Sequence, residues 1–249
     1  MLKGVEIVLR NSVQEIVKED YRTADIFHQY GINYCCGARI SLEDVCENLG
    51  LNIDTIRREL EFATRSTPAL SFTNVHQWHL DFLLDYIINI HHVYLRQNLP
   101  LVNEYMVRFK ESHGMQFKFL DELCYEVQKL HTRFISYLDE EENIIFPYIR
   151  QINSAHLHNE NYAGLLVRTL KKPVGNIYKS QQHELNLLLS ECRRIADNYV
   201  TPEKTCITHK VCFAKLAELD NNITHYIYIE NEILFPKTIS LEKYLTEKK

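Results

Sequence analysis

The stretch YIYIENEILFP, residues 226–236, sets Glu230 in the middle of an apolar and aromatic run. Burying an unpaired carboxylate is costly unless it is hydrogen-bonded, protonated or bound to a cation. The same frame recurs in YLDEEENIIFP, residues 137–147, where a Tyr, a Glu four residues later and a final Phe-Pro occupy matching places. Because residues i and i+4 lie on one face of a helix, the pattern predicts a Tyr–Glu pair on each of two helices.

The composition predicts an all-helical protein. The chain has 249 residues but only 7 Gly and 6 Pro, and its apolar residues recur at helical spacing. A net charge of -5, without a basic stripe, argues against nucleic-acid binding. Charged or His residues interrupt every long apolar run, so no membrane span is expected. An N-terminus that turns polar early and 7 scattered cysteines indicate a cytoplasmic protein with reduced thiols.

Two domains are expected along the chain. Residues 1–67 contain short helical patterns that end at glycines, Gly31 and Gly50 among them. Ser66-Thr67-Pro68 then interrupts the pattern, and we place the domain boundary there. Residues 68–249 carry four long amphipathic patterns, which predicts a four-helix bundle.

The two Tyr–Glu helices predict a polar cluster inside this bundle. The other two helices offer His92 and His183, and carboxylates with imidazoles on bundle helices are how non-haem di-iron sites are built. Each residue also has a plainer interpretation. Glu141 lies in a DEEE run typical of a solvated face, His92 fits a hydrogen-bonded core histidine, and His183 in QQHE fits an exposed position. The repeated frame favours the metal site.

A pair of adjacent cysteines marks the N-terminal domain. Cys35 and Cys36 directly precede Gly37, in a turn before a predicted helix, with Arg39 close by. A helix N-terminus and a nearby positive charge both lower the pKa of a thiol, so we interpret the pair as redox or transfer thiols. The alternative is two small residues buried in a small domain.

These motifs resemble the iron–sulfur cluster repair di-iron proteins of the RIC, ScdA or YtfE type. The resemblance rests on ADIFHQYGINYCCGARISLEDVC (24–46), HHVYLRQNLPLV (91–102), TPEKTC (201–206) and the two segments that end in Phe-Pro. It implies an ScdA-type N-terminal domain on a haemerythrin-like bundle that holds two iron ions. Carried over by position, the expected metal ligands are His92, His183, Glu141 and Glu230, and the cysteine pair falls on Cys35 and Cys36.

The chain departs from the family at two expected histidine ligands, where it has Tyr137 and Tyr226. One explanation is phenolate ligation, which favours oxidised iron or manganese. A second is a weaker site built from the remaining His and Glu ligands. A third is a site without metal, in which each Tyr hydroxyl hydrogen-bonds a retained Glu. We favour a retained but altered metal site.

The resemblance implies a function in the repair of iron–sulfur clusters damaged by nitrosative or oxidative stress, by iron donation in one version. Iron–sulfur proteins are then the expected partners, and a homodimer with Cys35 and Cys36 at its contact is also compatible with the sequence. Two other hypotheses use the same fold: a regulatory module without metal or with an altered metal, and a sensor of nitric oxide or oxygen. The sequence does not decide whether the protein is an enzyme.

Overall fold

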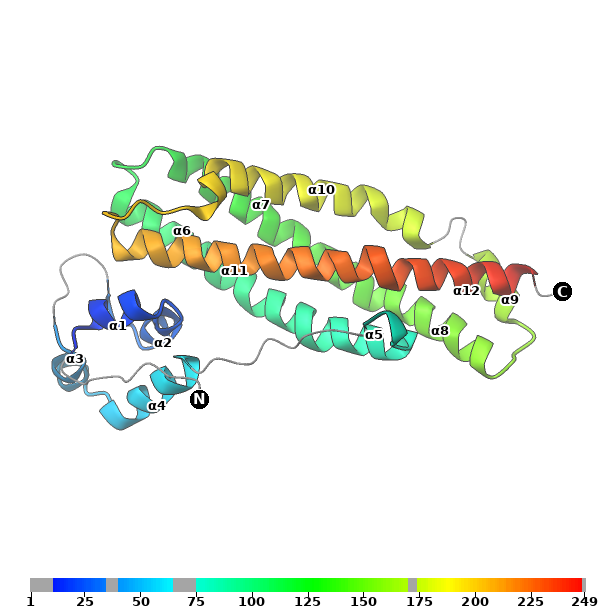
Figure 1. Cartoon of the computed structure of the whole chain (residues 1–249), viewed down its shortest axis with the longest axis horizontal. Coiled ribbons are helices and arrows are strands. Elements are labelled where there is room, and N and C mark those ends of the chain that lie inside the picture. Colours follow the sequence, from blue (N-terminus) through cyan, green and yellow to red (C-terminus); the bar gives the residue numbers. More distant parts are fainter. Residues whose placement is uncertain (1–10, 35–39, 65–74, 170–173, 248–249) are drawn as a thin grey trace. The chain divides into compact units, whose positions relative to one another are not determined.

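The computed structural model describes residues 11–34, 40–64, 75–169 and 174–247, apart from the side chains of residues 169 and 175–181 (Figure 1). Within these ranges the secondary structure is helical except for one isolated bridge between Ser12 and Ser41. The prediction of an all-α fold with a helical bundle is confirmed. No helix in the described part of the chain is long and apolar enough to cross a membrane.

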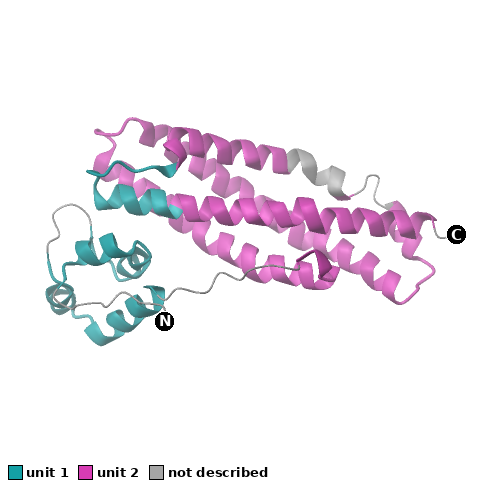
Figure 2. Ribbon diagram, in the orientation of Figure 1, with its two compact units in different colours: residues 1–71, 199–215 teal, residues 72–198, 216–249 magenta. Residues whose placement is uncertain are grey.

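The chain divides into two compact units, coloured separately in Figure 2. The first comprises residues 1–71 and 199–215, and the second comprises residues 72–198 and 216–249. The predicted boundary at residues 67 and 68 lies outside the described residues.

The first unit contains four short helices. These are α1 (Val13–Glu19), α2 (Thr23–Gln29), α3 (Leu42–Leu49) and α4 (Ile53–Thr64). Ser12 caps α1 through a reciprocal pair of hydrogen bonds with Glu15, and Gly50 ends α3 in the left-handed conformation at φ 64°. A capping box therefore begins α1, and a glycine ends α3 at Gly50, as the sequence predicted.

The second unit is built from four long helical rods, which lie side by side in Figure 1. Its helices are α5 (Leu80–Tyr86), α6 (Val93–His113), α7 (Phe119–Glu140), α8 (Phe146–Leu157), α9 (Ala163–Thr169), α10 (Val174–Ile195), α11 (Ile207–Ile229) and α12 (Phe235–Glu247), with residues 207–215 of α11 counted in the first unit. Three rods continue through a π-helical segment, Ile87–His92 between α5 and α6, Glu141–Ile145 between α7 and α8, and Glu230–Leu234 between α11 and α12. The fourth rod is α10.

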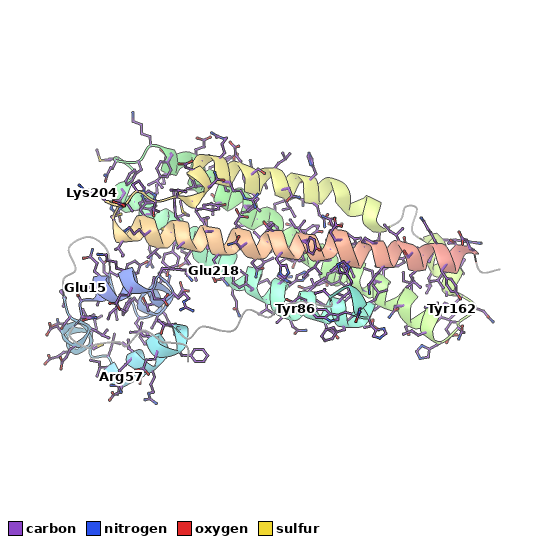
Figure 3. The ribbon with its side chains drawn as sticks, in the orientation of Figure 1. Glu15, Arg57, Tyr86, Tyr162, Lys204 and Glu218 are labelled. Atoms are coloured by element: carbon purple, nitrogen blue, oxygen red, sulfur yellow. The ribbon has the colours of Figure 1, made fainter. Side chains whose placement is uncertain are left out.

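An apolar interior holds the four rods together. Each rod contributes fully buried side chains, for example Leu95, Phe134, Leu185 and Ile223, and side chains fill the space between the ribbons in Figure 3. Each such side chain stabilises the fold by about 1.5–3 kcal/mol relative to an exposed one. This interior fixes which face of each helix points inward.

A guanidinium–carboxylate pair ties α10 to α11. Arg193 Nε donates to Asp220 Oδ2 over 2.6 Å, its Nη2 donates to the other oxygen, and the Asp220 side chain is only 7% exposed. In Arg193→Ala, the Asp220 carboxylate keeps only the hydrogen bond from the Thr224 hydroxyl among its contacts in the described residues. We expect a loss of about 2 kcal/mol in the free energy of unfolding, which is below the 3–5 kcal/mol lost when a fully buried ion pair is broken.

Arg194→Ala is the matched control, because Arg194 pairs with Glu122 and Glu191, and all three side chains are exposed. We expect it to cost less than about 1 kcal/mol. Urea unfolding followed by circular dichroism measures both variants. Equal losses for the two arginines would contradict a stabilising role for the pair with Asp220.

Candidate functional site

The polar residues predicted from the repeated frame lie at the π-helical segments. Glu141 and Glu230 each begin a segment, and His92 ends the third. Pro147 and Pro236 follow two of the segments closely; a proline lacks an N–H and crowds the carbonyl four residues earlier, so regular α-helical hydrogen bonding fails there. Helices commonly widen into π turns at functional sites, and here the widening is encoded by the Phe-Pro that ends each frame.

Five side chains of this region form one buried cluster. Tyr137, Glu141, Tyr226 and Glu230 are 0% exposed, and His92 is 1% exposed. The rings of Tyr137 and Tyr226 lie 6.4 Å apart, and the ring of His92 lies 5.6 Å from that of Tyr226. The prediction that both Tyr–Glu helices turn these residues into the bundle core agrees with this geometry, and Glu141 does not lie on a solvated face.

The two tyrosines hydrogen-bond to glutamates across the bundle. The Tyr137 hydroxyl donates to Glu230 Oε2 over 3.2 Å, and the Tyr226 hydroxyl donates to Glu141 Oε2. Each partner belongs to the other frame, since Tyr137 and Glu141 share one rod and Tyr226 and Glu230 share the other. The hydrogen bonds therefore cross between rods and join them.

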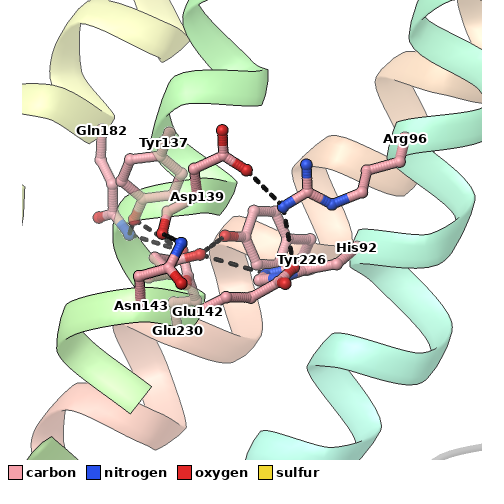
Figure 4. A network of polar contacts seen from close by, with 10 residues as sticks. His92, Arg96, Tyr137, Asp139, Glu142, Asn143, Gln182, Tyr226 and Glu230 are labelled. Carbon is pink, nitrogen blue, oxygen red and sulfur yellow. Dashed lines mark hydrogen bonds and ion pairs between the residues drawn. The ribbon is translucent and has the colours of Figure 1, made fainter. Parts of the chain in front are cut away.

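Gln182, which the sequence analysis did not select, completes the Glu230 side of the cluster. Its Nε2 lies 2.8 Å from Glu230 Oε2 and 3.1 Å from the Tyr137 hydroxyl, and the residue is 3% exposed (Figure 4). His183, predicted as a metal ligand, is exposed on α10 and does not join the cluster. The structure thus puts an amide where the prediction put an imidazole.

His92 links the cluster to a charged group nearer the surface. Its Nδ1 lies 2.7 Å from Glu142 Oε1, and Arg96 Nη2 lies 3.1 Å from the same oxygen and 2.8 Å from Asp139 Oδ1 (Figure 4). When the ring carries its hydrogen on Nδ1, that nitrogen donates to the Glu142 carboxylate and Nε2 has the free lone pair. That nitrogen lies 3.2 Å from Glu141 Oε2.

Burial governs the protonation of the cluster. Burial raises the pKa of Glu141 to about 7 and raises the pKa of Glu230 well above its usual range, and the charge of Glu141 raises the pKa of Glu230 further. Burial, followed by the charges of both glutamates, raises the pKa of Tyr137 and of Tyr226 well above 10. Burial lowers the pKa of His92, so the ring is neutral. Both tyrosines are accordingly neutral phenols, and their hydroxyls donate hydrogen bonds.

The donor set does not fit a pair of iron ions. Lone pairs without a hydrogen-bond partner remain on His92 Nε2, Glu141 Oε1 and Glu230 Oε1. Two of the other expected ligand positions are occupied by Tyr137 and Tyr226, which donate hydrogen bonds instead. Gln182, next to the third expected position, also donates into the cluster. No group of three or more His, Cys, Asp or Glu side chains is arranged to hold a metal ion among the described residues. The prediction that His183 is a metal ligand does not agree with the structure, because its side chain is exposed.

The candidate thiols Cys35 and Cys36 lie outside the described residues. Three of the described cysteines, Cys46, Cys192 and Cys212, are buried. Burial raises the pKa of the Cys192 thiol to about 12, which makes it unreactive near neutral pH.

Known proteins resemble the chain over almost its whole length. Residues 9–64 match ScdA_N, described as a domain of unknown function (DUF542). An iron–sulfur cluster repair protein ScdA from Staphylococcus haemolyticus (strain JCSC1435) is 23% identical over 227 residues, covering 90% of this chain and 96% of that protein. An iron–sulfur cluster repair protein YtfE from Enterobacter sp. (strain 638) is 25% identical over 228 residues, covering 92% of this chain and 96% of that protein.

The chain is similar in sequence to proteins named iron–sulfur cluster repair proteins. The resemblance drawn from the Tyr-Cys-Cys-Gly sequence and the two Phe-Pro frames is thereby confirmed, and the matched residues 9–64 lie within the expected ScdA-type N-terminal region. Staphylococcus epidermidis (strain ATCC 12228 / FDA PCI 1200) has a further ScdA relative, 22% identical over 232 residues, with 93% of this chain and 99% of that protein covered. The similarity includes both the N-terminal domain and the bundle that holds the cluster.

Proposed function

We propose that this chain acts in the repair of iron–sulfur clusters damaged by nitrosative or oxidative stress. The observation that carries the proposal is the similarity to named repair proteins over about nine-tenths of the chain and 96% of two relatives. Iron–sulfur proteins are its partners, iron is the material restored to them, and the cytoplasm is its compartment. A homodimer through Cys35 and Cys36 stays a prediction.

The division of labour within the chain is part of the proposal. The thiols of Cys35 and Cys36 carry the redox or transfer step. Two resident iron ions in the bundle, or manganese in their place, are not included, because hydrogen-bond donors occupy two of the expected ligand positions and a third, His183, is exposed. Neither a regulatory module nor a gas sensor is favoured by a specific contact in the described residues.

The test follows a cluster-dependent enzyme in cells. Cells that lack this gene are exposed to nitric oxide, protein synthesis is stopped, and the activity of a dehydratase that needs a four-iron cluster is followed after the gas is removed. We expect activity to recover when the gene is restored and to stay low without it. Equal recovery in both strains would reject the proposed function.

A further inference from the structure

We infer that the core of the bundle is a metal-free hydrogen-bond network, in which the hydroxyls of Tyr137 and Tyr226 and the amide of Gln182 take the place of a resident pair of metal ions. The inference goes beyond the proposed function, because it concerns what holds the bundle together and not which clusters are repaired. It contradicts our prediction of a retained, altered metal site.

The polarity of the side chains carries the inference. A metal ion in a bundle core is held by lone pairs that all point toward it. Here the hydroxyls of Tyr137 and Tyr226 and the amide of Gln182 are hydrogen-bond donors. Each of them donates to a carboxyl oxygen of one of the two buried glutamates. The donors thus satisfy oxygens whose negative charge a metal ion neutralises in a di-iron bundle.

The connectivity supports the same conclusion. Bridging metal ions connect helices that are distant in sequence, and the crossed hydrogen bonds do so as well. Tyr137 and Glu230 are separated by 93 residues, Tyr226 and Glu141 by 85, and Gln182 and Glu230 by 48. Three of the four rods meet in these bonds, so the network ties the bundle together without an ion.

The remaining lone pairs are too few for two ions. His92 Nε2, Glu141 Oε1 and Glu230 Oε1 are the cluster atoms left without a hydrogen-bond partner. The neutral ring of His92 is already held through its Nδ1 by Glu142.

The first measurement is made on the unmodified full-length protein. It is purified without oxygen, incubated with ferrous iron, freed of loosely held metal, and tested for metal content and thermal unfolding. We expect far less than one iron per chain, and a midpoint that moves by less than about 1 °C when iron or a chelator is added. A bound ion at 100 times its dissociation constant raises the midpoint of a chain this size by about 5–10 °C. One or two retained ions, or such a rise, would overturn the inference.

The second measurement reverses the polarity of the cluster. In Tyr137→His/Gln182→His/Tyr226→His, each proton donor becomes an imidazole that supplies a lone pair. We expect this variant to take up about two irons per chain, the content of a di-iron bundle. Tyr148→His is the control, because Tyr148 also donates to a buried carboxyl, that of Glu242 at 2.9 Å, but lies outside the cluster.

The two measurements separate the possible failures. A folded triple variant that binds no more iron than the Tyr148→His control would reject these three residues as the reason why the bundle excludes metal. Where the triple variant does not fold, the metal content and unfolding of the unmodified protein still decide. Neither measurement reads repair activity, so failure of the proposed function leaves both results standing.

Discussion

Tyr226→Phe is expected to lower the free energy of unfolding by about 3 kcal/mol. The substitution keeps the ring and removes the hydroxyl that donates to Glu141 Oε2, in a place where both residues are 0% exposed. Leaving a buried acceptor without its donor lowers the free energy of unfolding by about 1–3 kcal/mol, and by more when the acceptor is charged. His92 Nε2, 3.2 Å from the same oxygen, is a neutral nitrogen and does not replace the lost donor while its hydrogen lies on Nδ1.

Tyr137→Phe provides an internal comparison. It removes the hydroxyl that donates to Glu230 Oε2, but Gln182 Nε2 still donates to that oxygen over 2.8 Å. We therefore expect a smaller loss, about 1 kcal/mol. Tyr148→Phe, outside the cluster, should also lose about 1 kcal/mol, because Tyr148 is only partly buried. Chemical unfolding of the three variants in parallel measures the differences. A loss for Tyr226→Phe no larger than for Tyr148→Phe would show that the cluster hydroxyl adds nothing special.

The repeated frame allowed the site to be located from the sequence, but not its pairing. Spacing of four residues on a helix places Tyr226 and Glu230 on one face, and both do lie in the core. Which glutamate accepts from which tyrosine depends on how two rods pack and on the π-helical segments that begin at Glu141 and Glu230. Those are tertiary features, so the crossed hydrogen bonds were not available from helical periodicity.

The choice between Gln182 and His183 was available from the sequence and was made wrongly. Leu185, Leu189 and Cys192 are buried on α10, and stepping back three residues from Leu185 reaches Gln182. His183 lies four residues before Leu187, which is 56% exposed. The apolar period of the helix thus selects Gln182. The expectation of a histidine ligand outweighed that periodicity.

Two glutamates side by side show a different limit. Within the DEEE run, Glu141 is 0% exposed, whereas the side chain of the next residue, Glu142, is 31% exposed and pairs with His92 and Arg96. Composition alone predicts a solvated face for such a run. The match to the second frame, which sets Glu141 in register with Glu230, is what identified the buried residue.

Replacing both adjacent cysteines, Cys35→Ser/Cys36→Ser, is expected to abolish cluster repair while the thermal unfolding of the bundle stays unchanged. Tyr137 and Tyr226 donate hydrogen bonds at two expected ligand positions, and we therefore proposed that the reactive chemistry belongs to the adjacent cysteines. The sequence predicts that the two cysteines precede a helix, with Arg39 nearby, and such a position lowers the pKa of a thiol and makes it reactive.

The control for this prediction is Cys124→Ser, which removes a thiol from the bundle. Cys124 is partly buried and donates to the carbonyl of Met106, a bond that a serine hydroxyl can also make, and burial raises the pKa of its thiol. We expect this variant to repair clusters at the rate of the unmodified chain in the nitric oxide assay. Full repair by the Cys35→Ser/Cys36→Ser variant would instead remove the thiols from the mechanism. Delivery of iron by the bundle would then be the remaining route, and the iron content of the unmodified protein would decide whether the bundle binds the iron that this route needs.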